Sequence, residues 1–196
     1  DVSFNPVAIA YAFVDDKQTY LFIPQQKITQ EVASQLAADG IAIYDYSKIN
    51  DFLANLPKET ILALDFNRIN FSLYAKATCQ KRNLPSAVID AKSIKNETEL
   101  QGIRSAMVRD GVAMVNFLKW LEESIEKEHL TELSVSEKLK NFRAEQLLFA
   151  GESFNTIAGY AAHGAIVHYA ATEESNATLA PENFLLLDSG GQYFDG

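Results

Sequence analysis

The residue best suited to metal chemistry is Asp188, which follows the apolar run 184–187 near the end of the chain. The small residues Ser189, Gly190 and Gly191 come directly after it. A carboxylate at the end of a buried strand is a hard oxygen donor, the kind that divalent cations prefer. The pattern is therefore compatible with a metal ligand, although Asp-Ser-Gly is also ordinary turn chemistry.

Two histidines precede Asp188. His168 closes the apolar run 164–167 and stands before Tyr169. Its imidazole could be neutral or charged, and the alternative to a functional role is a strand-end histidine satisfied by backbone groups. His163 stands five residues earlier, which places it on the opposite face of a regular strand, and we expect a loop residue near the entrance of a site. His129, in the charged segment 126–129, is expected to face solvent.

Other side chains have simpler interpretations. Phe154 is a candidate for an apolar subsite, but core packing explains it as well. Trp120 is expected in the core or at a domain interface, and Asp195 in a turn. The acidic pair 173–174 is expected in a solvated loop, and Cys79 as a small buried apolar residue.

Composition excludes several classes of protein. The 196 residues allow one large domain or two small ones, and 47% hydrophobic with 22% charged residues is typical of a folded globular protein. A net charge of −9 argues against nucleic acid and anionic membranes as partners. No apolar run approaches the roughly 20 residues needed to span a bilayer. The single cysteine excludes an internal disulfide and indicates a reducing, cytoplasmic location.

Strands that alternate with helices fill the first half of the chain. A polar turn at 15–18 separates two strand-like segments, which predicts a hairpin. The predicted order is strands at 7–14 and 19–23, a helix at 28–38, a strand at 41–44, a helix at 47–56, a strand at 61–64, a helix at 71–79 and a strand at 86–89. This alternation indicates an α/β domain.

A different pattern begins near residue 93, where we place the domain boundary. Asn96 and Glu99 form a capping-box motif, which predicts the start of a long helix. Apolar residues then recur every three or four positions, at Leu100, Ile103, Met107, Met114, Phe117, Leu121 and Ile125. A second helix is predicted at 135–147, and strands with Gly-rich turns from Ser153 onward.

With these motifs placed, the chain resembles the Xaa-Pro aminopeptidases of the creatinase/methionine-aminopeptidase "pita-bread" superfamily. The likeness runs over nearly all 196 residues, and its most specific part is His168 followed by Asp188 twenty positions later. The similar segments are Asn5-Pro6-Val7, Lys95 to Leu100, Ile103 to Ala106, Ser153 to Ile157, Gly164 to Tyr169 as a histidine-bearing strand, and Leu187 to Tyr193 with Asp195-Gly196.

The resemblance implies a creatinase N-terminal-like middle domain at 1–92, truncated at its start and so expected to expose a sheet edge. It implies the N-terminal part of a pita-bread metallopeptidase domain at 93–196. It further implies two divalent ions, usually manganese, held by two Asp, one His and two Glu. Asp188 matches the first of these ligands, and His168 matches a residue that hydrogen-bonds substrate or the tetrahedral oxyanion. His163 and Phe154 would be weaker candidates for substrate contact.

We therefore expect a piece of a cytoplasmic, homodimeric enzyme that removes the first residue from peptides whose second residue is proline. The other ligands would lie beyond Gly196, so residues 1–196 alone are expected to bind no metal and to be inactive. Two alternatives stay open, namely a prolidase-type dipeptidase and a pita-bread protein that binds peptides or histones without catalysis. An interaction domain of unrelated ancestry would leave the match at 164–196 to chance.

Overall fold

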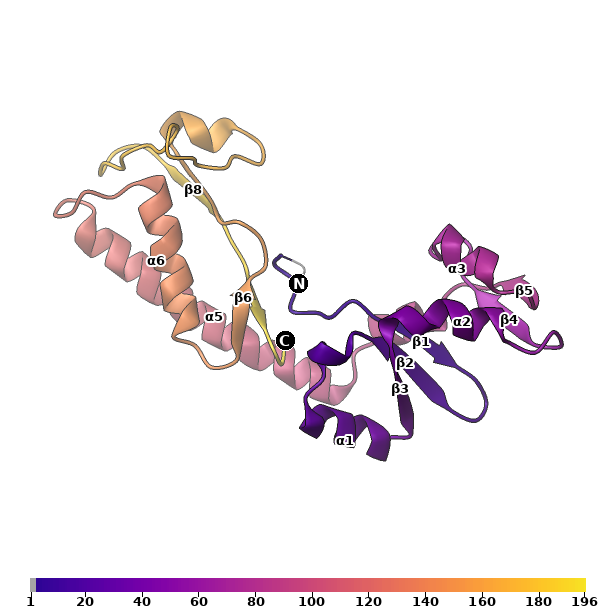
Figure 1. Cartoon of the computed structure of the whole chain (residues 1–196). Helices are drawn as coiled ribbons and strands as arrows, with labels where there is room; N and C mark the ends of the chain where they lie inside the picture. Colours follow the sequence, from indigo (N-terminus) through magenta and orange to yellow (C-terminus); the bar gives the residue numbers. More distant parts are fainter. Residues whose placement is uncertain (1–2) are drawn as a thin grey trace. The chain divides into compact units, whose positions relative to one another are not determined.

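The computed structural model describes residues 3–196, so Asp1 and Val2, at the start of the predicted first domain, lie outside the described residues. Contacts divide the described chain into two compact units. The first holds Val7–Ile94, and the second holds Lys95–Gly196 together with residues 3–6. Each unit is described by itself below (Figure 1).

The first unit is built from a hairpin and two strand–helix–strand crossovers. β1 (Tyr11–Val14) and β2 (Thr19–Ile23) are antiparallel, which confirms the predicted hairpin, although β1 begins four residues later than expected. β2 continues through α1 (Gln30–Ala38) to β3 (Ile41–Asp45), which pairs with it in parallel. The same arrangement recurs in β4 (Ile61–Leu64), α3 (Phe71–Lys76) and β5 (Gln80–Asn83). β4 and β5 pair in parallel, and α3 lies in the crossover connection that parallel neighbours need.

The core of this unit lies between the strands and the short helices. α2 (Ile49–Ala54) contributes Ile49 and Leu53, which pack with Phe22, Leu62 and Leu73. Cys79 is 5% exposed and belongs to the same cluster, so its prediction as a buried apolar residue is confirmed. Hydrophobic burial of this kind stabilises the unit in proportion to the apolar area removed from water.

One predicted strand of this unit is wrong. Residues 86–89 were expected to be extended, but they lie in α4 (Ala87–Ser93), which starts after Pro85 and Ser86. Val88 and Ile89 are exposed, so the apolar run does not enter a sheet. The last strand is instead the polar segment β5, whose backbone pairs with β4 although its side chains show no strand-like alternation.

Two long helices form the base of the second unit. α5 (Glu97–Ser124) begins at the predicted capping box, where Asn96 accepts from the Glu99 N–H and the Glu99 carboxylate accepts from the Asn96 N–H. α6 (Glu132–Ala144) starts three residues before the predicted position, because Thr131 caps it with a hydrogen bond from the Ser134 N–H. The two helices pack side by side (Figure 1).

The buried face of α5 differs from the predicted apolar stripe in its first half. Phe117 is fully buried as expected, but Met107 is 68% exposed and Ala106 is buried in its place. A Cβ on Gly102 would collide with the Asp195 backbone, and one on Gly196 would collide with Ala106. The end of the chain therefore approaches α5 over small residues, and this shifts the buried face by one position.

Two antiparallel strand pairs complete the unit. β6 (Phe149–Glu152) pairs with β9 (Gly191–Tyr193), and β7 (Ile157–Tyr160) pairs with β8 (Leu185–Asp188). α6 contacts β6 and β7, and Leu139 from α6, Ala158 from β7 and Leu179 share one core cluster with Phe117. Over residues 3–196, no helix combines the length and the apolar character needed to cross a membrane.

Candidate active site

Asp188 stands at the end of β8, as its sequence context predicts. Along β8 the side chains of Leu185 and Leu187 pack on the helical core, whereas Leu186 and Asp188 are exposed on the other face. Asp188 lies opposite Ile157 in the β7–β8 ladder. The chain then turns against Ser153, where a Cβ on Gly190 would come within 2.2 Å of the Ser153 Oγ, so the turn packs closely on this side chain. The backbone at Asp188 is thus held by the β7–β8 pairing and by this turn, while its carboxylate is exposed.

His168 does not lie on a strand, and that part of the prediction is wrong. Residues 161–165 form a 3₁₀ helix, and a turn follows that carries His168. The reason is a close approach of two backbones: a Cβ on Gly159 would lie 3.0 Å from the N and Cα of Gly164. The apolar run 164–167 therefore folds back over β7 instead of pairing with a neighbour, and Ile166 and Val167 are exposed.

The backbone is strained at both ends of this loop. Ala161 has φ 51° and His168 has φ 56°, in the left-handed region that residues with a Cβ seldom adopt. Each such residue costs on the order of 1–3 kcal/mol and persists only where the surroundings hold it. The His168 side chain is exposed, and among the described residues it forms no hydrogen bond. The same holds for Asp188 within the described part of the chain.

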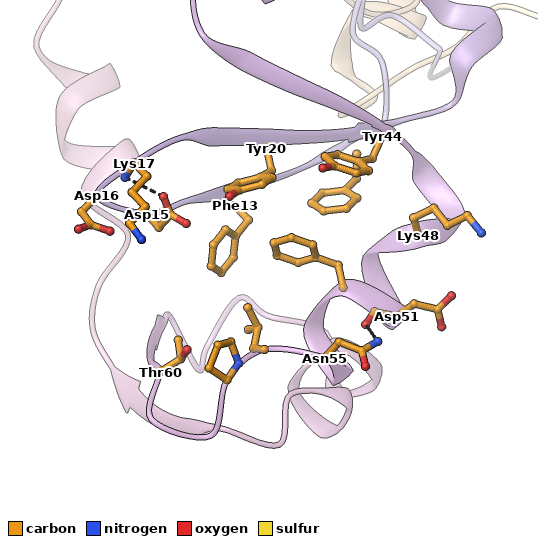
Figure 2. A pocket seen from close by; sticks show the side chains of 14 residues that line it. Phe13, Asp15, Asp16, Lys17, Tyr20, Tyr44, Lys48, Asp51, Asn55 and Thr60 are labelled. Atoms are coloured by element: carbon orange, nitrogen blue, oxygen red, sulfur yellow. Dashed lines mark hydrogen bonds between the residues drawn. The ribbon is translucent and has the colours of Figure 1, made fainter.

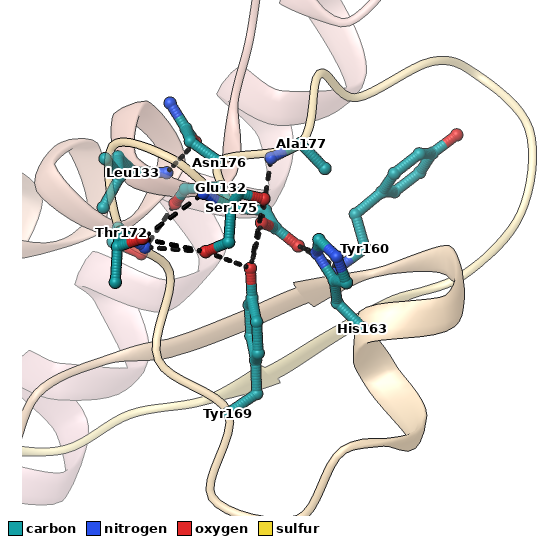
Figure 3. A network of polar contacts seen from close by, with 10 residues as sticks. Glu132, Leu133, Tyr160, His163, Tyr169, Thr172, Ser175, Asn176 and Ala177 are labelled. Carbon is teal, nitrogen blue, oxygen red and sulfur yellow. Dashed lines mark hydrogen bonds and ion pairs between the residues drawn. The ribbon is translucent and has the colours of Figure 1, made fainter.

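A buried carboxylate, Glu132, holds this loop (Figure 3). Glu132 is 0% exposed, and its Oε1 accepts from the Tyr160 N–H at 2.7 Å and contacts His163 Nδ1 at 2.9 Å. Its Oε2 accepts from the Tyr169 O–H at 2.8 Å and from the Ala177 N–H at 3.0 Å. The imidazole of His163 also stacks on the ring of Tyr169, with centroids 4.6 Å apart.

These contacts decide the ionisation of Glu132. Burial acts to raise the pKa of its carboxyl, but the hydrogen bonds from Ala177, Tyr160, Tyr169 and His163 favour the charged form and outweigh burial. The net effect is a pKa below the ordinary value. Glu132 is therefore a carboxylate at neutral pH, as its four donor contacts require.

Sequence reasoning missed Glu132, whereas His163 lies in the connection between β7 and β8, in a loop as expected. Glu132 opens a helix whose one other acidic residue, Glu137, is exposed, so its type and position suggest a solvated N-terminal turn. Its donors come from residues 28 to 45 positions away, and the sequence does not reveal that pairing. The argument that set His163 apart from His168 assumed strand alternation, which a 3₁₀ helix does not follow.

A second buried charged group lies at the opposite end of α6. Arg143, 1% exposed, donates from Nε and Nη2 to the two oxygens of Asp110 in α5, at 2.8 and 3.1 Å. The Tyr193 O–H donates to Asp110 Oδ1 at 3.1 Å. Burial, together with the charge of Asp110 and the hydrogen bond to it, raises the pKa of Tyr193 to about 12. Asp195 lies in the predicted turn and pairs with Arg109, a contact that the sequence did not indicate.

The remaining candidates have mixed outcomes. Phe154 is half-buried with its ring beside Gly190, a placement that leaves both its core and its subsite interpretation open. Trp120 packs on the core of the second unit, as expected. His129 is exposed, as expected, and its Nε2 lies 3.2 Å from the Thr178 Oγ1. Glu173 and Glu174 are exposed in a turn, also as expected.

The first unit contains a cavity of about 800 Å³ between its sheet and α2 (Figure 2). The rings of Phe13, Tyr20, Tyr44 and Phe52 line it, with Asp51 at its edge. It is a hydrophobic surface with polar groups at its rim. No histidine or cysteine lines it.

A metal centre needs several donors that converge on one point. Over residues 3–196, no group of three or more His, Cys, Asp or Glu side chains is placed to hold a metal ion. Asp188 supplies one open carboxylate, and two divalent ions need several. The residues of this chain therefore do not fit a dinuclear site by themselves.

Two family models together match nearly the whole chain. Residues 1–99 match the Creatinase/Prolidase N-terminal domain, and residues 101–196 match Metallopeptidase family M24. Among curated proteins, the chain is 40% identical over its full length to Xaa-Pro aminopeptidase 1 of Dictyostelium discoideum and 34% identical to Aminopeptidase P2 of Arabidopsis thaliana. It spans about a third of the length of these relatives, 32% of each.

Solved structures agree with this relationship. A cytosolic X-prolyl aminopeptidase of Caenorhabditis elegans, described as having a di-nuclear active site, superposes with a TM-score of 0.89 at 28% identity, over 100% of this chain and 33% of that one. A Bacillus anthracis Xaa-Pro dipeptidase shares the fold at a TM-score of 0.71 and 18% identity, over 96% of this chain and 52% of that one. The chain belongs to the family of proteins with a Creatinase/Prolidase N-terminal domain, and residues 101–196 are similar to Metallopeptidase family M24.

Proposed function

We propose that this chain is part of a dinuclear metal-dependent Xaa-Pro aminopeptidase, which hydrolyses the first residue from peptides with proline in the second position. The observation that carries the proposal is the similarity to Xaa-Pro aminopeptidases over all of the chain, at up to 40% identity. The dipeptidase is less than 25% identical and supports only the fold. Residues 1–92 would form part of a middle domain and residues 93–196 the first part of the catalytic domain.

We assign separate roles to Asp188 and His168. Asp188 would be the one metal ligand that this chain contributes, since its carboxylate is exposed and rigidly mounted at the end of β8. In such enzymes a pair of ions activates water and polarises the scissile carbonyl. His168 would donate a hydrogen bond to the substrate or to the oxyanion that forms on it, a task that suits an exposed imidazole with no competing partner among the described residues.

The other substrate contacts are weaker proposals. Phe154 would contribute to an apolar subsite, since its ring lies half-exposed near the turn after Asp188. His163 is the weakest, because its Nδ1 contacts Glu132 and its ring stacks on Tyr169. Manganese as the metal, a homodimeric assembly and a cytoplasmic location are proposed on the resemblance, and the C. elegans relative is described as cytosolic.

The decisive test is hydrolysis of an Xaa-Pro peptide by the full-length protein and by residues 1–196, each with and without manganese. We expect activity in the full-length protein alone and its loss in the Asp188→Ala variant. Activity of residues 1–196 would contradict the role of Asp188 as one ligand of a larger set. Inactivity of the full-length protein in every metal would reject the peptidase and favour a non-catalytic binding protein.

A further inference from the structure

One carboxylate holds both ends of the loop that carries His168. Tyr160 precedes the loop and donates its N–H to Glu132 Oε1, and Tyr169 follows the loop and donates its O–H to Glu132 Oε2 (Figure 3). His163 contacts Oε1 from within the loop. Tyr169 is 8% exposed, so the residue directly after the exposed His168 is buried and anchored.

We propose that Glu132 is a positioning residue for His168: by fixing Tyr160, His163 and Tyr169, its carboxylate holds the His168 backbone in the conformation from which the imidazole reaches the substrate. This inference rests on the proposed function, because it assumes that His168 acts in catalysis. Glu132 itself is fully buried, so the proposed role acts through these groups and not through direct contact with the substrate.

The strain in the loop makes such an anchor necessary. Ala161 and His168 both have positive φ, and each would relax toward an ordinary conformation if the loop were released. The imidazole of His168 has no hydrogen-bond partner of its own among the described residues, so its place depends on the backbone that carries it. A rotation of the backbone at this residue would move the ring by an ångström or more, enough to lower the rate of catalysis by about 100-fold.

The geometry also specifies the substitution that tests the anchor. Each oxygen of Glu132 receives two donor contacts. In Glu132→Gln one oxygen becomes an NH₂ group, so whichever way the amide turns, one backbone N–H, that of Tyr160 or of Ala177, faces another donor. The size of the side chain is kept, while at least one of the four anchoring contacts is lost. Glu137→Gln is the matched control, since Glu137 lies on the same helix and is exposed beside Lys140.

The experiment is a double-mutant cycle in the full-length protein, with Glu132→Gln, His168→Ala and both together. Hydrolysis of an Xaa-Pro peptide in manganese gives kcat and KM, and bound metal is measured in each variant. We expect Glu132→Gln to lower kcat by about 10- to 100-fold with KM and metal content little changed. In the His168→Ala background the same substitution should have almost no further effect, because the residue that it positions is absent. Glu137→Gln should match the wild type.

The outcomes separate the two proposals. If His168→Ala leaves activity unchanged, the role of His168 is wrong and the positioning role of Glu132 falls with it. If His168→Ala lowers activity but Glu132→Gln lowers it by the same factor in both backgrounds, His168 is retained and the positioning role is overturned. Wild-type activity in Glu132→Gln, or loss of its metal, also overturns the positioning role.

A structural readout covers the case in which Glu132→Gln folds poorly. Tyr169→Phe removes one contact to Oε2 and leaves the carboxylate intact, so it should show a smaller decrease in kcat with the same dependence on His168. Amide hydrogen exchange should rise at least about tenfold in segment 160–169 of either variant and stay unchanged in α5. Equal increases throughout the second unit would indicate general destabilisation and overturn the proposal.

Discussion

α6 buries one charged residue at each of its ends, and the two have different kinds of partner. Glu132, its first residue, accepts from two backbone N–H groups and from the Tyr169 O–H, and it also contacts His163. Arg143, in its last turn, forms a bidentate ion pair with Asp110 of α5. Both are almost completely shielded from water, at 0% and 1% exposed. Acidic groups at helix starts and basic groups at helix ends also suit the helix dipole.

This difference indicates that the two buried groups have different roles in the second unit. The Arg143–Asp110 pair joins α5 to α6 and binds Tyr193 of β9, so it secures the framework. The Glu132 contacts secure the loop that carries His168, the side chain proposed to contact the substrate. Loss of Arg143 should therefore affect stability most, and loss of Glu132 should affect function more than stability.

The largest expected effect is that of Arg143→Met. The substitution keeps most of the apolar stem but leaves the Asp110 carboxylate with the Tyr193 hydrogen bond alone. Breaking a buried ion pair costs about 3–5 kcal/mol, and we expect the lower end of this range because the Asp110 side chain is 26% exposed. Urea unfolding of the chain, followed by the fluorescence of its only tryptophan, Trp120 in the second unit, measures the loss. Lys140→Met, at an exposed site on the same helix, should change stability by less than about 0.5 kcal/mol. A loss below that of the control would contradict the framework role.

The Glu132→Gln variant should destabilise the same unit by a smaller amount. At least one backbone N–H, that of Tyr160 or of Ala177, loses its acceptor and no uncompensated charge remains, so about 1–3 kcal/mol is expected for the polar group left unsatisfied. The same fluorescence measurement applies, with Glu137→Gln as the control. A loss greater than that of Arg143→Met would reverse the ranking and make the Glu132 contacts part of the framework.

The second unit also shows which structural features can be predicted from the sequence and which cannot. The start of α5 was predicted to the residue, because a capping box is made by Asn96 and Glu99 three positions apart. Asp188 was placed correctly for a similar reason, since a strand and its end are encoded locally. The loop at 161–168 was not, because its shape depends on the approach of Gly159 to Gly164.

The burial of a charged side chain is even harder to predict from the sequence than the shape of this loop. Glu132 and Arg143 are by type ordinary surface residues, although their spacing from Val135 and Leu139 puts them on the buried face of α6. Their burial follows from partners tens of positions away. The buried stripe on α5 differs from the predicted stripe for a related reason. The end of the chain packs on the small residues Gly102 and Ala106, whereas the prediction placed larger residues on the buried face.

A smaller effect should follow Tyr193→Phe, which removes one hydrogen bond from the Arg143 end and costs about 1 kcal/mol at neutral pH. The wild type should also lose this advantage in alkali. The pKa of Tyr193 is raised to about 12 from 10.0, mainly by burial, so the folded chain keeps a proton that the unfolded chain releases. Stability of the wild type relative to the variant therefore falls as the pH rises from 10.0 towards 12. A constant difference over this range would contradict the contact with Asp110.

The smallest effect is the acid dependence of the Glu132 end. The pKa of Glu132 is lowered below 4.5 by its hydrogen bonds, which outweigh its burial. A carboxyl whose pKa is lower in the folded state stabilises the fold above its unfolded pKa, and this contribution is lost as the pH falls through the folded pKa. The difference in unfolding free energy between the wild type and Glu132→Gln should thus be constant near neutral pH and shrink below pH 4.5. If the Glu132→Gln difference persisted undiminished in acid, the hydrogen bonds to the carboxylate would not be its source, and the side chain would stabilise the loop through packing alone.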